Sequence, residues 1–141
     1  MSDIVEFLTA RLDEDEAYAL NAAESVSRGW FEPFSGAVQF GGPEDNPECE
    51  MALTYDSGIS RHMVRHDPAR VLAEVKAKRA IGKAQQDFAA RVANASYKGY
   101  DALNYHRDRG TEAALMGTLR YLAAPYADHP DYQQAWSVNL T

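Results

Sequence analysis

The chain has 141 residues, of which 45% are hydrophobic and 25% charged, a composition typical of one folded domain. Its formal net charge is −7, and its single cysteine, Cys49, excludes an internal disulfide. No apolar run approaches the ~20 residues that a membrane-spanning helix needs, and the acidic N-terminus does not resemble a secretory signal. We therefore expect a cytoplasmic protein with no membrane partner.

Charge is divided unevenly along the chain. Residues 1–58 contain 13 acidic and 2 basic side chains, whereas residues 59–124 contain 12 basic and 6 acidic ones. Such polarity indicates either a surface for a partner, or two parts that pair with each other or with a second copy of the chain. The second interpretation is the simpler one for a small domain.

Residues 1–27 are predicted to form an N-terminal amphipathic helix. Asp3 and Glu6 have the spacing of a capping box at its start. The acidic run 13–16 is expected to face solvent, because four adjacent positions point in four directions around a helix. One buried face is expected to contain the apolar residues that recur near the helical period, which are Ile4, Leu8, Leu12, Ala19, Ala23 and Val26.

Residues 28–58 form a β-rich insert in this interpretation. Five of the nine glycines and three of the six prolines lie here, between short apolar runs. We expect two strands, at 37–40 and 51–55, joined as a hairpin through residues 41–47. Because two strands alone are marginally stable, the hairpin must pack against helices. Cys49 is interpreted as a structural thiol.

A short helix is predicted from Ile59 to Arg65, capped by Asp56 or Ser57. His62 and His66 stand four residues apart, a spacing that lets two imidazoles meet one metal ion. A zinc site needs a third ligand, for which Glu50, His106 and His129 are the candidates. The alternative is that one histidine packs against the hairpin while the other lies at a helix junction, so a metal-dependent hydrolase is one hypothesis among several.

The segment 59–106 is expected to continue as a long central helix, with Asp67 as N-cap and Pro68 at its first position. Unbroken from 68 to 106, it would measure ~57 Å, more than the ~37 Å diameter of such a domain. Either it breaks near Gly82 or Gly99, or a second copy covers it. The seam for such self-association is formed by small and apolar residues: Ala77, Ile81, Ala84, Phe88, Val92 and Ala95.

The same helix carries a basic arc that suggests nucleic-acid binding as an alternative function. Its members are Lys76, Arg79, Lys83 and Lys98. Asp87 and Asp101 interrupt this arc, and an interrupted basic face is more typical of a solvated surface than of a phosphate-binding one.

The C-terminal part is predicted to contain a break at Gly110–Thr111, a short helix over 111–124 and a packed aromatic tail over 125–141. Tyr126, Tyr132 and Trp136 should pack back onto the body of the protein. His129, between two aspartates, is interpreted as a residue of a local turn.

Three phrases of the sequence resemble a family of small actinobacterial and actinophage proteins of unknown function. They are the LDEDE helix (12–16), the RHDPARVLAEV helix start (65–75) and the PYADHPDY motif (125–132). The resemblance implies a phage or actinobacterial origin. It carries no catalytic residue over to this chain.

The sequence therefore predicts a single mainly helical α+β domain with an N-terminal helix, a small β-hairpin, a long central helix and a short C-terminal helix. We expect a non-enzymatic protein-interaction or regulatory module that forms a homodimer through the long helix and binds an unidentified protein partner. No catalytic residue and no cofactor are assigned, because spacing alone assembles no nucleophile, base and oxyanion donor.

Overall fold

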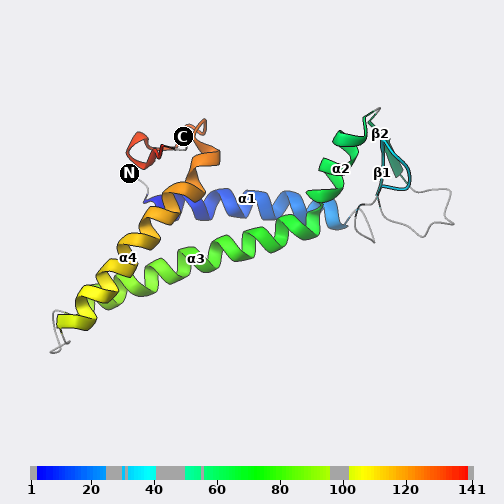
Figure 1. Ribbon diagram of the computed structural model, residues 1–141. Coiled ribbons are helices and arrows are strands. Elements are labelled where there is room, and N and C mark those ends of the chain that lie inside the picture. The colour runs from blue at the N-terminus through cyan, green and yellow to red at the C-terminus, as the bar shows by residue number, and fades with distance from the viewer. Residues whose placement is uncertain are drawn as a thin grey trace. The chain divides into compact units, whose positions relative to one another are not determined.

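The computed structural model describes residues 3–24, 30, 32–40, 50–54, 56–95 and 102–139. These ranges form a mainly helical α+β fold, which confirms the predicted fold class (Figure 1). The elements in chain order are α1 (Ile4–Glu24), β1 (Ala37–Phe40), β2 (Glu50–Leu53), α2 (Ser57–Arg65), α3 (Pro68–Ala95), α4 (Ala102–Ala123) and the 3-10 helices η1 (Ala124–Tyr126) and η2 (Gln134–Trp136).

Aspartates begin three of the helices, as their positions in the sequence predict. Asp3 and Glu6 form the capping box of α1, in which Asp3 Oδ1 accepts from Val5 N and Glu6 Oε2 accepts from Asp3 N. At the start of α2, Asp56 Oδ1 accepts from the backbone N–H groups of residues 58 and 59. Asp67 Oδ1 accepts from residue 70 at 2.8 Å and begins α3. These bonds satisfy amide groups that have no partner within the helix.

The buried face predicted for the N-terminal helix is confirmed over most of its length. Ile4, Leu8, Leu12 and Ala19 are buried. Ala23 is exposed near the end of α1, so its predicted burial is wrong, and Val26 lies outside the described residues. A single methyl group gains little from burial, so alanine is a weak marker of a helix face.

Strands β1 and β2 form the predicted antiparallel hairpin, with Ala37 opposite Leu53 and Phe40 opposite Glu50. Gly36 precedes β1 with a positive φ of 84°, a conformation that favours glycine. Its carbonyl oxygen accepts from both Thr54 N, at 2.8 Å, and Thr54 Oγ1, at 3.0 Å. The connection between the strands, including Cys49, lies outside the described residues.

The chain divides into two compact units. The helical unit contains residues 1–12 and 76–141, and the hairpin unit contains residues 13–75. Helices α1 and α3 each contribute residues to both units. The prediction of one domain over residues 1–141 stays a prediction.

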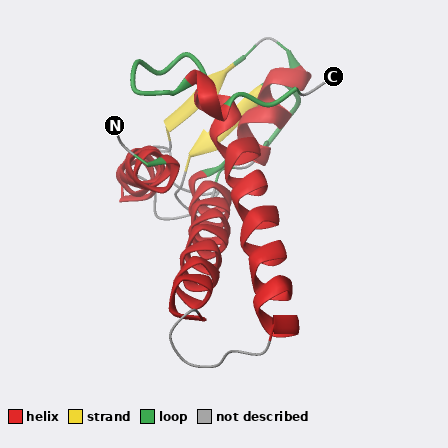
Figure 2. Cartoon of the chain, turned by 90° about the vertical axis from the view of Figure 1, so that its left-hand side faces the viewer, coloured by secondary structure: helices red, strands yellow, loops and turns green. Residues whose placement is uncertain are grey.

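In the helical unit, α4 lies beside the part of α3 that follows Lys76 and runs in the opposite direction (Figure 1, Figure 2). The long helix predicted to reach residue 106 ends at Ala95, and α4 begins at Ala102. Of the two candidate positions for a break, Gly82 is excluded, because α3 passes through Gly82 without interruption. The other candidate, Gly99, lies in the segment 96–101, outside the described residues.

The predicted break at Gly110–Thr111 is wrong, because α4 continues through both residues. Thr111 Oγ1 donates to the carbonyl oxygen of Arg107 at 3.1 Å, which places the hydroxyl within the helix rather than at a cap. A helical glycine costs only about 1 kcal/mol relative to alanine, which packing of the helix offsets.

Candidate functional site

An aromatic cluster holds the C-terminal tail on the first turns of α1, as the sequence predicts. Phe7 is 3% exposed, and its ring centroid lies 6.3 Å from that of Tyr126, 5.9 Å from Tyr132 and 5.1 Å from Trp136. The core of the helical unit continues from this cluster through Ile4, Leu8, Leu119 and Ala123. The helical unit therefore has a hydrophobic core to which the C-terminal tail is anchored.

Arg11 is 9% exposed and connects α1 to this tail. Its guanidinium lies 5.6 Å from the centre of the Phe7 ring, and its Nη1 hydrogen-bonds to Nε2 of His129. The other ring nitrogen, Nδ1, lies 3.9 Å from Asp131 Oδ2. The backbone N–H of Asp131 donates to the same Nδ1 at 3.2 Å. His129 thus belongs to the turn and to Arg11.

Part of the small-residue seam of α3 is buried within the helical unit. Ile81 packs against the core cluster and Ala95 is buried, whereas Ala77 is exposed and the other three seam residues, Ala84, Phe88 and Val92, are half-buried. Near the seam, buried Gln85 donates from Nε2 to Glu112 Oε1 on α4 at 3.1 Å. Self-association through the seam stays a prediction.

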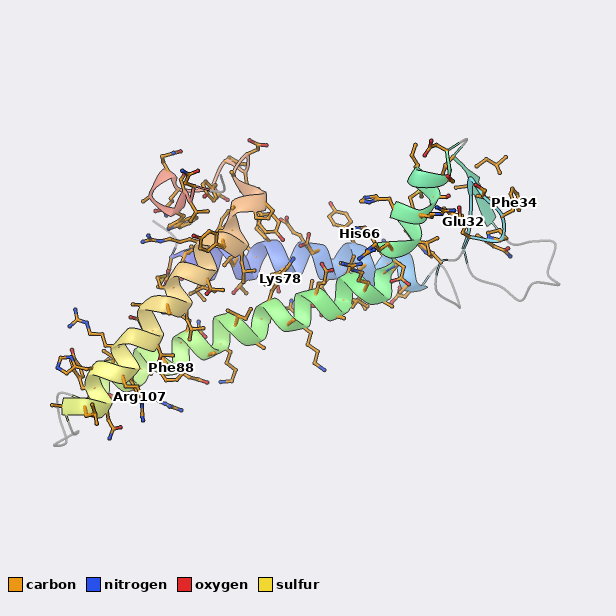
Figure 3. All side chains as sticks on the ribbon, viewed as in Figure 1. Glu32, Phe34, His66, Lys78, Phe88 and Arg107 are labelled. Carbon is orange, nitrogen blue, oxygen red and sulfur yellow. The ribbon has the colours of Figure 1, made fainter. Side chains whose placement is uncertain are left out.

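A second face of α3 borders an apolar pocket of about 170 Å³ in the helical unit. We call it the rimmed pocket. Its apolar wall combines residues of α1 and α4, namely Val5, Leu8, Leu12, Leu119 and Leu122. The α3 side is polar and mostly cationic, and consists of Lys78, Arg79, Gly82, Lys83 and Gln86, while Thr9 completes the lining. Figure 3 labels Lys78 on this stretch of α3.

Gly82 leaves the wall of the rimmed pocket open. A Cβ atom built at Gly82 would meet no atom within 4 Å, so no neighbour in the helical unit requires glycine there. Glycine inside a helix nevertheless costs about 1 kcal/mol relative to alanine. Gly110 and Gly117 of α4 are equally uncrowded but do not line the pocket. Of these three glycines, Gly82 is therefore the one at which an added side chain would reduce access to the pocket.

Lys83, at the rim of the pocket, is held loosely. It pairs with Asp87 at 3.1 Å, but the two side chains are 75% and 52% exposed. Such an exposed pair on one helix contributes only about 0.3–0.5 kcal/mol, so Lys83 can turn to another carboxylate at little cost. The rim therefore offers positive charge beside an apolar cavity.

The predicted nucleic-acid arc is only partly reproduced at this site. Arg79 and Lys83 line the rimmed pocket, Lys76 is exposed outside its lining, and Lys98 lies outside the described residues. Sequence reasoning missed Lys78, although positions 78, 79, 82, 83 and 86 recur at the spacing of one helix face. From this spacing, the residues of α3 that line the pocket could have been predicted.

The hairpin unit has a more open cavity of about 240 Å³ beside His66. His66, labelled in Figure 3, is the C-cap of α2. Its ring centroid lies 4.5 Å from that of His62, so the two imidazoles share one face, as their spacing predicts. Within the described ranges, no group of three His, Cys, Asp or Glu side chains is placed to hold a metal ion. The cavity is lined by Asp15, Tyr18, Ala19, Ala22, Trp30, His66, Pro68 and Val71.

A carboxylate joins the segment before β1 to α2. Glu32 Oε1 accepts from the hydroxyl of buried Ser60 at 2.5 Å and from Gly36 N at 3.4 Å, and Glu32 Oε2 lies 3.5 Å from Arg61 Nε (Figure 3). The Ser60 hydrogen bond, opposed by partial burial and aided by the Gly36 amide and the Arg61 charge, lowers the pKa of Glu32 below its ordinary value of 4.5. The cluster borders neither of the two cavities described above.

Replacing Ser60 with alanine is expected to raise the pKa of Glu32 toward 4.5, because the largest stabilising hydrogen bond to the carboxylate is lost. In the wild type, a lowered folded-state pKa contributes stability above pH 4.5 that is lost as the pH falls through the folded value. A carbon-detected NMR titration of the glutamate carboxyl groups measures the pKa of Glu32 in both proteins. An unchanged Glu32 titration in Ser60→Ala would contradict the assignment.

These observations define a mainly helical α+β protein with a cation-rimmed apolar pocket in its helical unit. Over residues 1–138 the sequence matches a family of unknown function, DUF6221, and the chain belongs to that family. No curated protein and no solved structure matches the chain. Among the residues that the structure describes, no helix has both the length and the apolarity to cross a membrane.

Proposed function

We propose that the chain is a non-enzymatic protein-interaction module, and that the rimmed pocket receives an apolar side chain from an acidic helix of a partner. The observation that supports the proposal is an apolar cavity bordered by Lys78, Arg79 and Lys83 and left open at Gly82. Apolar pockets with few polar groups at their edge are typical of binding sites. An acidic amphipathic helix supplies both an apolar anchor and carboxylates.

The dimensions favour a helical partner. Lys78 and Lys83 are five residues apart on α3, which corresponds to ~7.5 Å along the axis. Carboxylates one turn before and after an apolar residue of a partner helix lie ~12 Å apart, within reach of two flexible lysine side chains. Helices that place apolar anchors in a groove are a recurring mode of peptide recognition.

The interaction is expected to be weak. Burial of one large apolar side chain contributes about 1.5–3 kcal/mol, and each exposed ion pair contributes about 0.2–1 kcal/mol. Even before the cost of association, these contributions sum to at most about 6 kcal/mol, which corresponds to a Kd no tighter than roughly tens of micromolar. Such an affinity suits a reversible, regulatory contact.

The competing proposal is nucleic-acid binding through Lys76, Arg79, Lys83 and Lys98. The ion pair between Lys83 and Asp87 argues against it, because phosphates would have to approach a carboxylate on the same face. A hydrolase that uses His62 and His66 would need a third metal ligand from the residues that the structure leaves undescribed.

A fluorescent helical peptide of leucine, alanine and glutamate tests the proposal directly. We expect its anisotropy to rise with protein concentration and the binding to weaken as salt is added. A matched peptide with lysine in place of glutamate should bind at least tenfold more weakly, since the rim repels it. Equal binding of the two peptides would contradict the proposal, and stronger binding of duplex DNA would favour the nucleic-acid alternative.

We also propose an origin and a location for the protein. The resemblance to small actinobacterial and actinophage proteins supports a phage or actinobacterial origin. The single cysteine, which can form no disulfide within the chain, supports a cytoplasmic location.

A further inference from the structure

The second half of α1 presents an acidic face with an apolar centre. Leu20 is 46% exposed, unusual for a leucine of a helix whose first half is built into a core. Asp13, Ala17 and Glu24 are exposed as well, and their separations of four, three and four residues place them on the same helix face as Leu20. This face, which we call the acidic face of α1, has an apolar middle, with Asp13 about two turns before Leu20 and Glu24 one turn after it, so the two carboxylates are ~16.5 Å apart along the axis.

The acidic face of α1 and the rimmed pocket are complementary in charge and in polarity. The pocket has an apolar interior and three cations at its edge, whereas the face has an exposed leucine between two carboxylates. Ala17, next to Leu20 on this face, allows close approach of two helices because its side chain is small. The distribution of charge along the sequence agrees with an acidic surface on α1, since residues 1–58 contain 13 acidic and 2 basic side chains.

We propose that the partner helix is supplied by a second copy of this chain, whose Leu20 enters the rimmed pocket while Asp13 and Glu24 face the cations of α3. This inference rests on the proposed function and names its partner. The contact uses a face of α3 other than the small-residue seam, so it leaves the packing of Ile81 and the burial of Ala95 unchanged. Reversible self-association then regulates access of other acidic helices to the pocket.

Three properties of the association follow from this contact. It weakens as salt increases, because exposed charges separated by about 10 Å are screened at ordinary ionic strength. It requires Leu20, because the apolar anchor contributes most of the contact. It also requires opposite charges on the two surfaces, whichever of them is negative.

Two charge-reversal variants test the inference by sedimentation velocity. The pocket variant is Lys78→Glu with Lys83→Glu, and the helix variant is Asp13→Lys with Glu24→Lys. Each variant alone places like charges on both surfaces and should self-associate at least tenfold more weakly than the wild type. An equimolar mixture restores opposite charges at both kinds of contact, so we expect association to return to about the wild-type level.

Two further variants separate specific from general effects. Lys76→Glu reverses one lysine of α3 outside the pocket lining and should leave association within about twofold of the wild type. Leu20→Ala changes no charge and should weaken association about tenfold, as expected for loss of a buried anchor. Circular dichroism of every variant verifies that the helices are intact.

The outcomes distinguish this inference from the proposed function. A wild-type protein that stays monomeric at several hundred micromolar, or a mixture that fails to recover association, would overturn the inference. If the acidic peptide still binds in that case, the proposed function stands and its partner is another protein. If the acidic peptide does not bind either, both fail.

Discussion

Replacing Phe7 with alanine is expected to lower the free energy of unfolding of the helical unit by about 3–5 kcal/mol. Phe7 is 3% exposed and its ring contacts those of Tyr126, Tyr132 and Trp136, so the variant leaves a cavity where α1 meets the tail. Part of the loss comes from the aromatic pairs themselves, which contribute about 0.5–1.5 kcal/mol each beyond burial. Urea unfolding followed by circular dichroism measures the change.

The matched control for this variant is Tyr121→Ala. Tyr121 is 57% exposed on α4, so its loss should change the free energy of unfolding by no more than about 0.5 kcal/mol. If Phe7→Ala cost as little as the control, the aromatic cluster would not be the anchor of the tail. The aromatic cluster would then not explain how Leu119 and Leu122 of α4 are held at the pocket.

Replacing Gly82 with leucine is expected to reduce the affinity for the acidic peptide at least tenfold. A side chain at this position extends into space that the structure leaves empty at the wall of the rimmed pocket. The helix itself should not suffer, because leucine has a higher helix propensity than glycine by nearly 1 kcal/mol. The variant therefore separates binding from folding, and anisotropy with the labelled peptide measures the loss.

Gly117→Leu is the control for the pocket variant. Gly117 is also a helical glycine at which an added Cβ atom would meet nothing within 4 Å, but it does not line the pocket. We expect similar helix stabilisation and unchanged peptide affinity. Equal losses of affinity in the two variants would show that the effect does not come from the pocket.

Local chemistry explains why helix starts were predictable from the sequence. Asp3, Asp56 and Asp67 each accept backbone hydrogen bonds within three residues, so their effect does not depend on the rest of the fold. The aromatic tail was predictable for a related reason, since Tyr126, Tyr132 and Trp136 are too apolar for a solvated segment.

Glycine positions were poor guides to helix ends. Gly82 and Gly110 both lie within helices, because a cost of about 1 kcal/mol is smaller than the gain from packing a whole helix face. The rimmed pocket was beyond reach of the sequence for another reason. Its wall joins Leu8 of α1 to Leu119 and Leu122 of α4, and no spacing pattern relates residues so far apart in the chain.

Leucine methyl NMR during a titration with the acidic peptide reports whether an acidic helix occupies the rimmed pocket. We predict concentration-dependent shifts of the methyl groups of Leu8, Leu12, Leu119 and Leu122, which line the pocket. The methyl groups of Leu53 and Leu103, which are exposed elsewhere, should not shift. Shifts confined to Leu53 or Leu103, or no shifts at saturating peptide, would contradict binding in the pocket.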